Sequence, residues 1–197
     1  MNKIFLSLVF ISLSCTNPFD TRDPKPPQTI NPIQPISNLQ NDPDSLLKQI
    51  QLAFQELEWN YYDALLVDPT KSGTDFVFIP QQDAVYTYGL QNWTRQDELN
   101  YFKNLIHNRK KNDLILQIYN VQGPVQIGAS QDTMQTQFSY QIEIYQENRK
   151  EYYNGQGIFK MLRSQQSLWY IFYWEDLKAS KERADSTWSV VKASYRY

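Results

Sequence analysis

The stretch MQTQFSYQIEIY, residues 134–145, alternates apolar and polar side chains. One face carries the apolar set Phe138, Tyr140, Ile142 and Ile144. The opposite face carries the polar set Gln137, Ser139, Gln141 and Glu143. A period of two residues is the pattern of a strand that buries one face. The stretch therefore predicts a long strand in an antiparallel sheet.

Three further strand patterns surround this stretch. They cover residues 114–121 with a continuation at 125–127, residues 157–163, and residues 169–174. Polar segments at 128–132, 147–150 and 164–167 supply the turns between the strands. This order predicts an antiparallel meander.

Helical spacing comes before the meander. Seven apolar residues recur at helical intervals: Leu46, Leu47, Ile50, Ala53, Phe54, Leu57 and Tyr61. Asp44 or Ser45 can cap the start, and we expect a bend near Trp59 into a shorter helix that reaches Leu66. A short apolar strand is expected at residues 75–79, closed by Pro80.

A second helix is expected after Thr94, whose hydroxyl can cap it together with Asp97. Its apolar face consists of Leu99, Phe102, Leu105 and Ile106. His107, the only histidine, follows this face, and a role at the helix end is favoured over catalysis. Helices followed by a meander define the α+β class.

The order of these elements resembles the nuclear transport factor 2-like superfamily. The resemblance covers residues 45–176. It is carried by Asp75 to Pro80, Trp93 to Leu105, Gly157-Ile158-Phe159 with Met161, and Trp169-Tyr170-Ile171 with Trp174 and Asp176. It implies a curved antiparallel sheet packed around N-terminal helices, which together enclose an apolar cone. The superfamily holds isomerases, dehydratases and cyclases beside many non-catalytic binders, so the resemblance implies no activity.

The first residues predict an export signal. Lys3 precedes an apolar run from Ile4 to Leu13 that is too short to span a bilayer, which predicts a signal peptide at residues 1–14. The end of this run, Leu13-Ser14-Cys15, resembles a bacterial lipobox, although Ser12 stands where that motif prefers Leu. Cys15, the only cysteine, is the predicted lipidation site. The alternative is an ordinary secretory signal with an incidental cysteine.

A tether and a C-terminal extension flank the predicted domain. Seven of the ten prolines lie between Pro18 and Pro43, so residues 15–43 predict an extended tether with little to bury. Residues 44–176 form the predicted domain. In the extension, residues 177–197, Trp188 and Val190 suggest a closing strand or a clasp packed on the domain.

The anchor places the protein in a bacterial cell envelope. Thr16 is not the Asp that signals inner-membrane retention in some bacteria, which favours the outer membrane. The formal net charge of −2 and the absence of a dense Lys/Arg stripe argue against nucleic-acid binding. The sequence is compatible with a homodimer.

The cone implied by the resemblance has its own candidate lining. The predicted pocket residues are Tyr61, Tyr62, Phe78, Phe102, Tyr140, Trp169 and Trp174. Catalytic relatives project a Tyr, an Asp and sometimes a His into the cone, and the residue types available here are Tyr61, Tyr62, Asp63, Asp75 and Tyr140. We assign no catalytic set, because packing with a solvent-facing hydroxyl is favoured for the tyrosines. Glu175 and Asp176 are interpreted as capping the strand end.

Other site patterns are missing from the sequence. There is no Gly-rich phosphate loop, no Gly-x-Ser-x-Gly elbow and no Cys/His cluster, so we predict no metal and no cofactor. The leading hypothesis is an envelope-anchored, non-catalytic module that binds a small apolar ligand or an envelope protein. The alternatives are an enzyme of the isomerase, dehydratase or cyclase type that uses polar groups in the cone, and a structural lipoprotein.

Overall fold

A computed structural model of the chain describes residues 40–146, 149–179 and 186–197. These residues fall within one compact unit, Gln34–Tyr197. The predicted signal peptide, Cys15 and nearly all of the predicted tether lie outside the described residues. No helix in the described part of the chain is long and apolar enough to cross a membrane.

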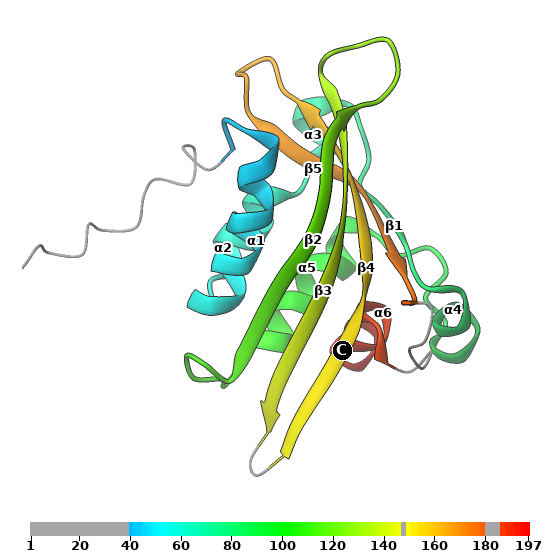
Figure 1. Ribbon diagram of the computed structural model, residues 1–197. Helices are drawn as coiled ribbons and strands as arrows, with labels where there is room; N and C mark the ends of the chain where they lie inside the picture. The colour runs from blue at the N-terminus through cyan, green and yellow to red at the C-terminus, as the bar shows by residue number, and fades with distance from the viewer. Residues whose placement is uncertain (1–39, 147–148, 180–185) are drawn as a thin grey trace, which may run out of the picture. The chain divides into compact units, whose positions relative to one another are not determined.

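The described domain is built on a five-stranded sheet with strand order β1-β5-β4-β3-β2 (Figure 1). The four long strands are β2 (Leu114–Gln126), β3 (Thr133–Gln146), β4 (Arg149–Arg163) and β5 (Trp169–Leu177). They pair in antiparallel succession, whereas the short β1 (Val77–Ile79) runs parallel to β5. The predicted meander and the α+β class are confirmed.

Six helices accompany the sheet in the described residues. They are α1 (Pro43–Glu56), α2 (Trp59–Leu65), α3 (Pro69–Ser72), α4 (Gln82–Tyr88), α5 (Arg95–Ile106) and α6 (Trp188–Ser194). Figure 1 shows α1, α2 and α5 along one side of the sheet. The alternating residues of β3 that face them, Phe138, Tyr140, Ile142 and Ile144, are all buried. The sequence assigned these four residues to one face.

The two long helices start with different capping residues. Thr94 and Asp97 form the expected capping box at the start of α5, with each side chain bonded to the other's backbone N–H. Asp42, rather than the predicted Asp44 or Ser45, caps α1. The helix therefore begins at Pro43, two or three residues earlier than predicted, and proline suits this position because its fixed φ matches the helix and its missing N–H is not needed there.

The largest boundary difference from the prediction is in β4. This strand begins at Arg149, eight residues before the predicted start, because its first half pairs with β3 from Gln146 to Ser139. The short helices α3 and α4 were not predicted at all.

The C-terminal segment is a helix, so the predicted closing strand is wrong. The α6 residues Trp188 and Lys192 are one helical turn apart, which brings both side chains to the same face. Both are wholly buried. Trp188 packs edge-on against Phe54 of α1 and Trp174 of β5, so α6 side chains occupy the space between helices and sheet.

Candidate functional site

The seven predicted pocket residues are all buried in the domain core. The rings of five of them contact one another or contact a ring of α6. Tyr62 stacks on Phe102 with ring centroids 3.9 Å apart, and Phe78 meets Trp174 edge-on at 6.0 Å. Tyr140 meets the α6 residue Trp188 at 5.0 Å.

The other two predicted pocket residues have different surroundings. The backbone carbonyl of Tyr61 accepts a hydrogen bond from the Gln49 amide. Trp169 lies at the start of β5, where its backbone N–H donates to the Gln40 carbonyl at 2.8 Å. Nothing in these contacts tests whether the seven residues bind a ligand.

A wholly buried carboxylate, Glu98 of α5, organises one side of the cone. Its Oε1 accepts a hydrogen bond from the Tyr62 hydroxyl at 2.5 Å, and its Oε2 accepts one from the Trp93 indole N–H at 2.7 Å. The ammonium of Lys192 donates to both oxygens at 2.6 Å. The carboxylate therefore has partners on both oxygens, as a buried charge requires.

The Lys192 ammonium is enclosed by aromatic rings as well as by Glu98. Nζ lies 3.5 Å from the ring centroid of Trp174 and 3.7 Å from that of Phe78. A cation at this distance from a ring face is attracted by the negative charge of the ring face. Burial lowers the pKa of Lys192 to about 8, and the negative charge of Glu98 opposes that shift.

A second buried carboxylate, Asp176 of β5, contacts the first turn of α6. Its Oδ1 accepts from the Tyr140 hydroxyl at 2.6 Å, and its Oδ2 accepts from the backbone N–H of Ser189 at 2.7 Å and from the Ser189 hydroxyl at 2.5 Å. The Tyr140 hydroxyl in turn accepts from the backbone N–H of Trp188 at 2.7 Å. The interpretation of Asp176 as a strand-end cap is therefore wrong, since this carboxylate holds the start of α6.

Burial and these carboxylates control the titration of the tyrosines in the cone. Burial, followed by the negative charge of Glu98, raises the pKa of Tyr62 well above its usual value. Burial and the charge of Asp176 do the same for Tyr140. Burial also raises the pKa of Asp176, against the hydrogen bonds from Ser189 and Tyr140. Both tyrosine hydroxyls are buried and bonded, so the expected solvent-facing hydroxyls are wrong.

The polar groups of the cone are engaged with the chain itself. An enzyme of the isomerase or cyclase type needs polar side chains that converge on open space, where they can exchange protons with a substrate. Glu98 and Asp176 do converge, but their hydrogen-bond partners include Lys192 and Ser189 of α6. Side chains of α6 fill the space next to both carboxylates.

The remaining acids and the histidine proposed from the sequence lie outside this network. Asp63 forms an ion pair with Arg95 at 2.5 Å, and Asp75 is exposed. His107 takes the C-cap position of α5. Within the described residues there is no group of three or more His, Cys, Asp or Glu side chains arranged to hold a metal ion.

An open cavity of about 620 Å³, which we call the hairpin cavity, lies between the helical end of the domain and the β4–β5 hairpin. Its lining combines α2, α3 and the segment between them with the start of α5 and the hairpin itself. Apolar groups come from Leu66, Leu162, Leu168 and Tyr170, and polar groups include Asp63, Arg95, Gln165 and Gln166. The volume lies in the range of about 300–1,000 Å³ that is typical of small-molecule sites.

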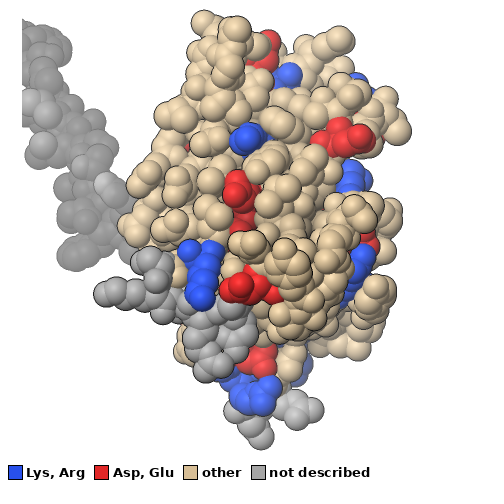
Figure 2. Space-filling model, turned by 90° about the vertical axis from the view of Figure 1, so that its right-hand side faces the viewer, with Lys and Arg blue, Asp and Glu red and all other residues tan. Residues whose placement is uncertain are grey.

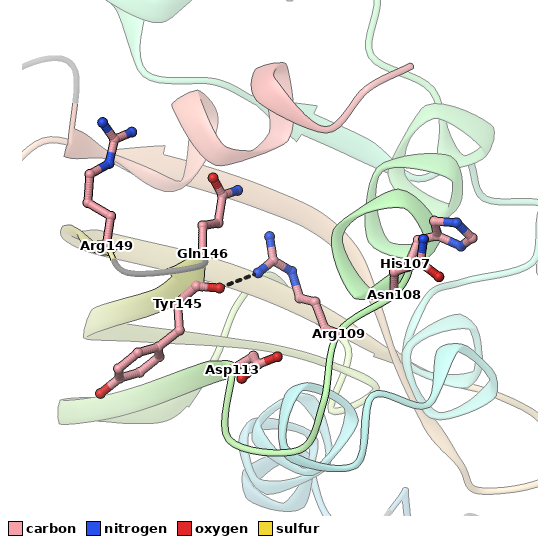
Figure 3. A pocket seen from close by; sticks show the side chains of 7 residues that line it. All are labelled: His107, Asn108, Arg109, Asp113, Tyr145, Gln146 and Arg149. Atoms are coloured by element: carbon pink, nitrogen blue, oxygen red, sulfur yellow. Dashed lines mark hydrogen bonds between the residues drawn. The ribbon is translucent and has the colours of Figure 1, made fainter.

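Another depression lies at the far end of α5 (Figure 3). Arg109 is at its centre, but its guanidinium already donates to the carbonyl of Tyr145 at 2.9 Å and to the hydroxyl of Tyr195 at 2.7 Å. In Figure 3 the His107 ring lies on the far side of Arg109 from Arg149. These three side chains therefore do not converge on one point.

The surface in Figure 2 carries charges of both signs side by side. Basic and acidic side chains alternate on this face with larger areas of uncharged residues. Lys150, for example, pairs with Glu143 at 2.6 Å, and Arg149 pairs with Glu151 at 2.7 Å. The prediction that nucleic acid is not a partner remains a prediction.

Comparison with solved structures identifies the fold. The domain is similar to the Kfla4162 protein of Kribbella flavida (8% identity, 75% of this chain and 94% of that chain, TM-score 0.52). It is also similar to a variant of Rv3472 from Mycobacterium tuberculosis, a protein of unknown function (9% identity, 78% and 82%, TM-score 0.50). A third similar structure is a nuclear transport factor 2-like superfamily protein from Salmonella enterica (11% identity, 74% and 95%, TM-score 0.49).

These likenesses concern the fold alone. Neither a protein-family model nor a curated protein matches the sequence. The mostly antiparallel sheet packed on helices is the α+β arrangement that the sequence predicted, and the Kfla4162 protein has a similar fold. Fold and activity are separate properties, so the function has to be argued from the site.

Proposed function

We propose that this protein is a lipid-anchored, non-catalytic binding domain of a bacterial cell envelope, and that it holds a small ligand in the hairpin cavity. The observation that carries the proposal is the cavity itself. It has the volume of a small-molecule site and combines apolar with polar lining, whereas the cone is filled by α6.

The lining favours a ligand with an apolar body and a few polar groups. Tyr170, Leu162 and Leu168 line the cavity and are half-buried. The Arg95 guanidinium is fixed at the cavity by the carbonyl of Val67 at 2.8 Å and by Asp63. Groups that are held before a ligand arrives lose little freedom on binding, which favours affinity.

The anchor is proposed from the sequence. A lipid on Cys15 with a proline-rich tether leaves the domain free to reach ligands at some distance from the bilayer. Metabolic labelling with a fatty acid tests it: wild type incorporates label and Cys15→Ala does not. Equal labelling of both proteins contradicts the anchor. Fractionation of the two membranes tests the preference for the outer membrane.

A ligand screen tests the binding proposal. The mature chain with Cys15→Ala is screened against lipids, sterols and glycans by thermal shift and native mass spectrometry. We expect a hit whose affinity falls at least tenfold in Tyr170→Ala. The matched control is Tyr119→Ala, which removes an exposed strand tyrosine outside the cavity. Absence of any hit, or equal loss in both variants, contradicts the proposal, and capture of an envelope protein through this surface identifies a protein partner instead.

A further inference from the structure

The side chain of Lys192 occupies a site in the cone that has the chemistry of an ammonium receptor. Its floor is the Glu98 carboxylate, which is oriented by the Tyr62 hydroxyl and the Trp93 indole N–H. Its walls are the faces of Phe78 and Trp174. We call these five residues the ammonium cage.

The hydrogen bonds of the cage define which cations it can take. Two N–H groups of the bound ammonium donate to Glu98, one to each carboxylate oxygen at 2.6 Å. The rings of Phe78 and Trp174 approach the same nitrogen within 3.7 Å. A trimethylammonium group could use the ring faces but has no N–H to donate to the carboxylate. The cage therefore fits an ammonium with at least two N–H groups, such as the primary ammonium of Lys192.

A second subsite adjoins the cage and holds the indole of Trp188. This indole donates its N–H to the Tyr101 hydroxyl at 2.8 Å and packs between Phe54, Tyr140 and Trp174. The subsite takes a flat ring with one hydrogen-bond donor. The two subsites together fit a ligand in which a primary ammonium lies beside an aromatic ring.

The helix that now fills both subsites depends on them for its structure. α6 has only seven residues, and helices of that length are unstable in water without tertiary contacts. The side chain of its N-cap residue, Thr187, makes no capping hydrogen bond, and the Thr187 hydroxyl is buried without a partner. α6 therefore behaves as a short peptide docked into the domain.

We propose that the cone is a binding site for a primary arylalkylammonium ligand, and that α6 occupies this site in cis through Lys192 and Trp188. A ligand of that chemistry competes with α6. This site is separate from the hairpin cavity. A negative result at one site therefore does not contradict the proposal for the other.

Chemical rescue of the full-length Lys192→Ala variant tests the cage. This variant opens a space of the size of the missing atoms Cγ to Nζ, and n-propylammonium has the same three carbons and one nitrogen. We expect n-propylammonium to raise the melting temperature with dose, because above the dissociation constant each tenfold increase in ligand multiplies the folded-to-unfolded ratio about tenfold. At equal ionic strength, propyltrimethylammonium and 1-propanol should have little effect. Equal effects of all three compounds, or no effect of n-propylammonium on a folded variant, contradict the proposed cage.

Lys192→Met is the matched control for this rescue. Its side chain refills the space without a charge, so n-propylammonium should leave its melting temperature unchanged. A rise as large as that of Lys192→Ala shows binding elsewhere and also overturns the cage.

Competition in the wild-type protein needs no substitution and covers the case in which Lys192→Ala does not fold. Tryptamine carries the indole and the primary ammonium in one molecule. We expect it to speed amide hydrogen exchange in Trp188–Ser194 while exchange in β3 stays constant or slows. N,N,N-trimethyltryptammonium is the control without ammonium N–H groups. If tryptamine leaves exchange in α6 unchanged, or if both compounds speed it equally, the competition is refuted.

Discussion

Polar side chains are buried in the cone but partly exposed at the hairpin cavity. In the cone, charged groups are wholly buried and each has partners within the chain, as with Glu98 and Lys192. At the hairpin cavity, the Asp63 and Arg95 side chains are about one-third and one-quarter exposed. The difference indicates that polar residues inside the cone hold the chain together, whereas those at the cavity remain partly exposed to solvent. Substitutions at the two ends should separate these roles.

The largest effect is expected from removing the Glu98 carboxylate. Glu98→Ala leaves the Lys192 ammonium buried without its counter-charge, and we expect a loss of about 3–5 kcal/mol in the free energy of unfolding. Urea denaturation measures it. The double variant Glu98→Leu with Lys192→Met should recover part of this loss, because neither partner is then a buried charge. Recovery is incomplete because the Tyr62 hydroxyl and the Trp93 indole N–H lose their acceptor. A loss below about 1 kcal/mol in Glu98→Ala contradicts the buried pair.

An intermediate effect with a pH dependence is expected at Tyr140. Tyr140→Phe removes the hydroxyl that bridges Asp176 and Trp188, at a cost of about 1–3 kcal/mol near neutral pH. In the folded protein the pKa of Tyr140 is raised, so above about pH 10 only the unfolded state releases this proton. Wild type should therefore lose stability relative to Tyr140→Phe as the pH rises through that range.

Chemical denaturation at a series of pH values measures this difference. Tyr119→Phe is the control, because Tyr119 is 45% exposed on β2. A constant difference between wild type and Tyr140→Phe up to pH 11 means that the buried hydroxyl does not resist ionisation, contrary to the structure.

A small effect is expected from the ion pair at the hairpin cavity. Asp63→Ala breaks the pair with Arg95, and partly exposed pairs contribute about 0–1 kcal/mol to stability. Thermal unfolding measures the loss. A loss as large as that of Glu98→Ala removes the distinction between the two ends.

The smallest effect is expected at the rim of the cavity. Gln166 is an exposed residue of the β4–β5 hairpin, so Gln166→Ala should change the free energy of unfolding by less than about 0.5 kcal/mol. Ligand binding by this variant, once a ligand is known, is the more informative measurement. A marked destabilisation shows that the hairpin side chains are structural.

Local patterns predicted the parts of the fold that local interactions determine. The alternation in residues 134–145 identified β3, and Thr94 with Asp97 identified the start of α5. The first half of β4 was missed because residues 149–156 are mostly polar and do not alternate. Their strand conformation comes from pairing with β3, which a single segment does not reveal.

The site was harder to predict because its members are distant in sequence. Lys192 lies 94 residues from Glu98, and neither residue alone signals a buried charge. A weak signal was present on α5, where Glu98 shares a helix face with Phe102 and Leu105 at intervals of four and seven residues. Trp188 and Val190 fit a period of two, although Trp188 and Lys192 also have helical spacing. The helical pattern is the one that applies, because it brings both Trp188 and Lys192 into the interior of the cone.

Amide hydrogen exchange of α6 in the full mature chain tests most directly whether the cone is filled. The backbone N–H groups of Trp188 and Ser189 donate to Tyr140 and Asp176 inside the cone. We predict that both exchange on the order of 10³-fold or more slowly than in an unstructured peptide, because exchange requires α6 to leave the cone. Exchange at the rate of an unstructured peptide would show that α6 does not occupy the cone, and would contradict the account.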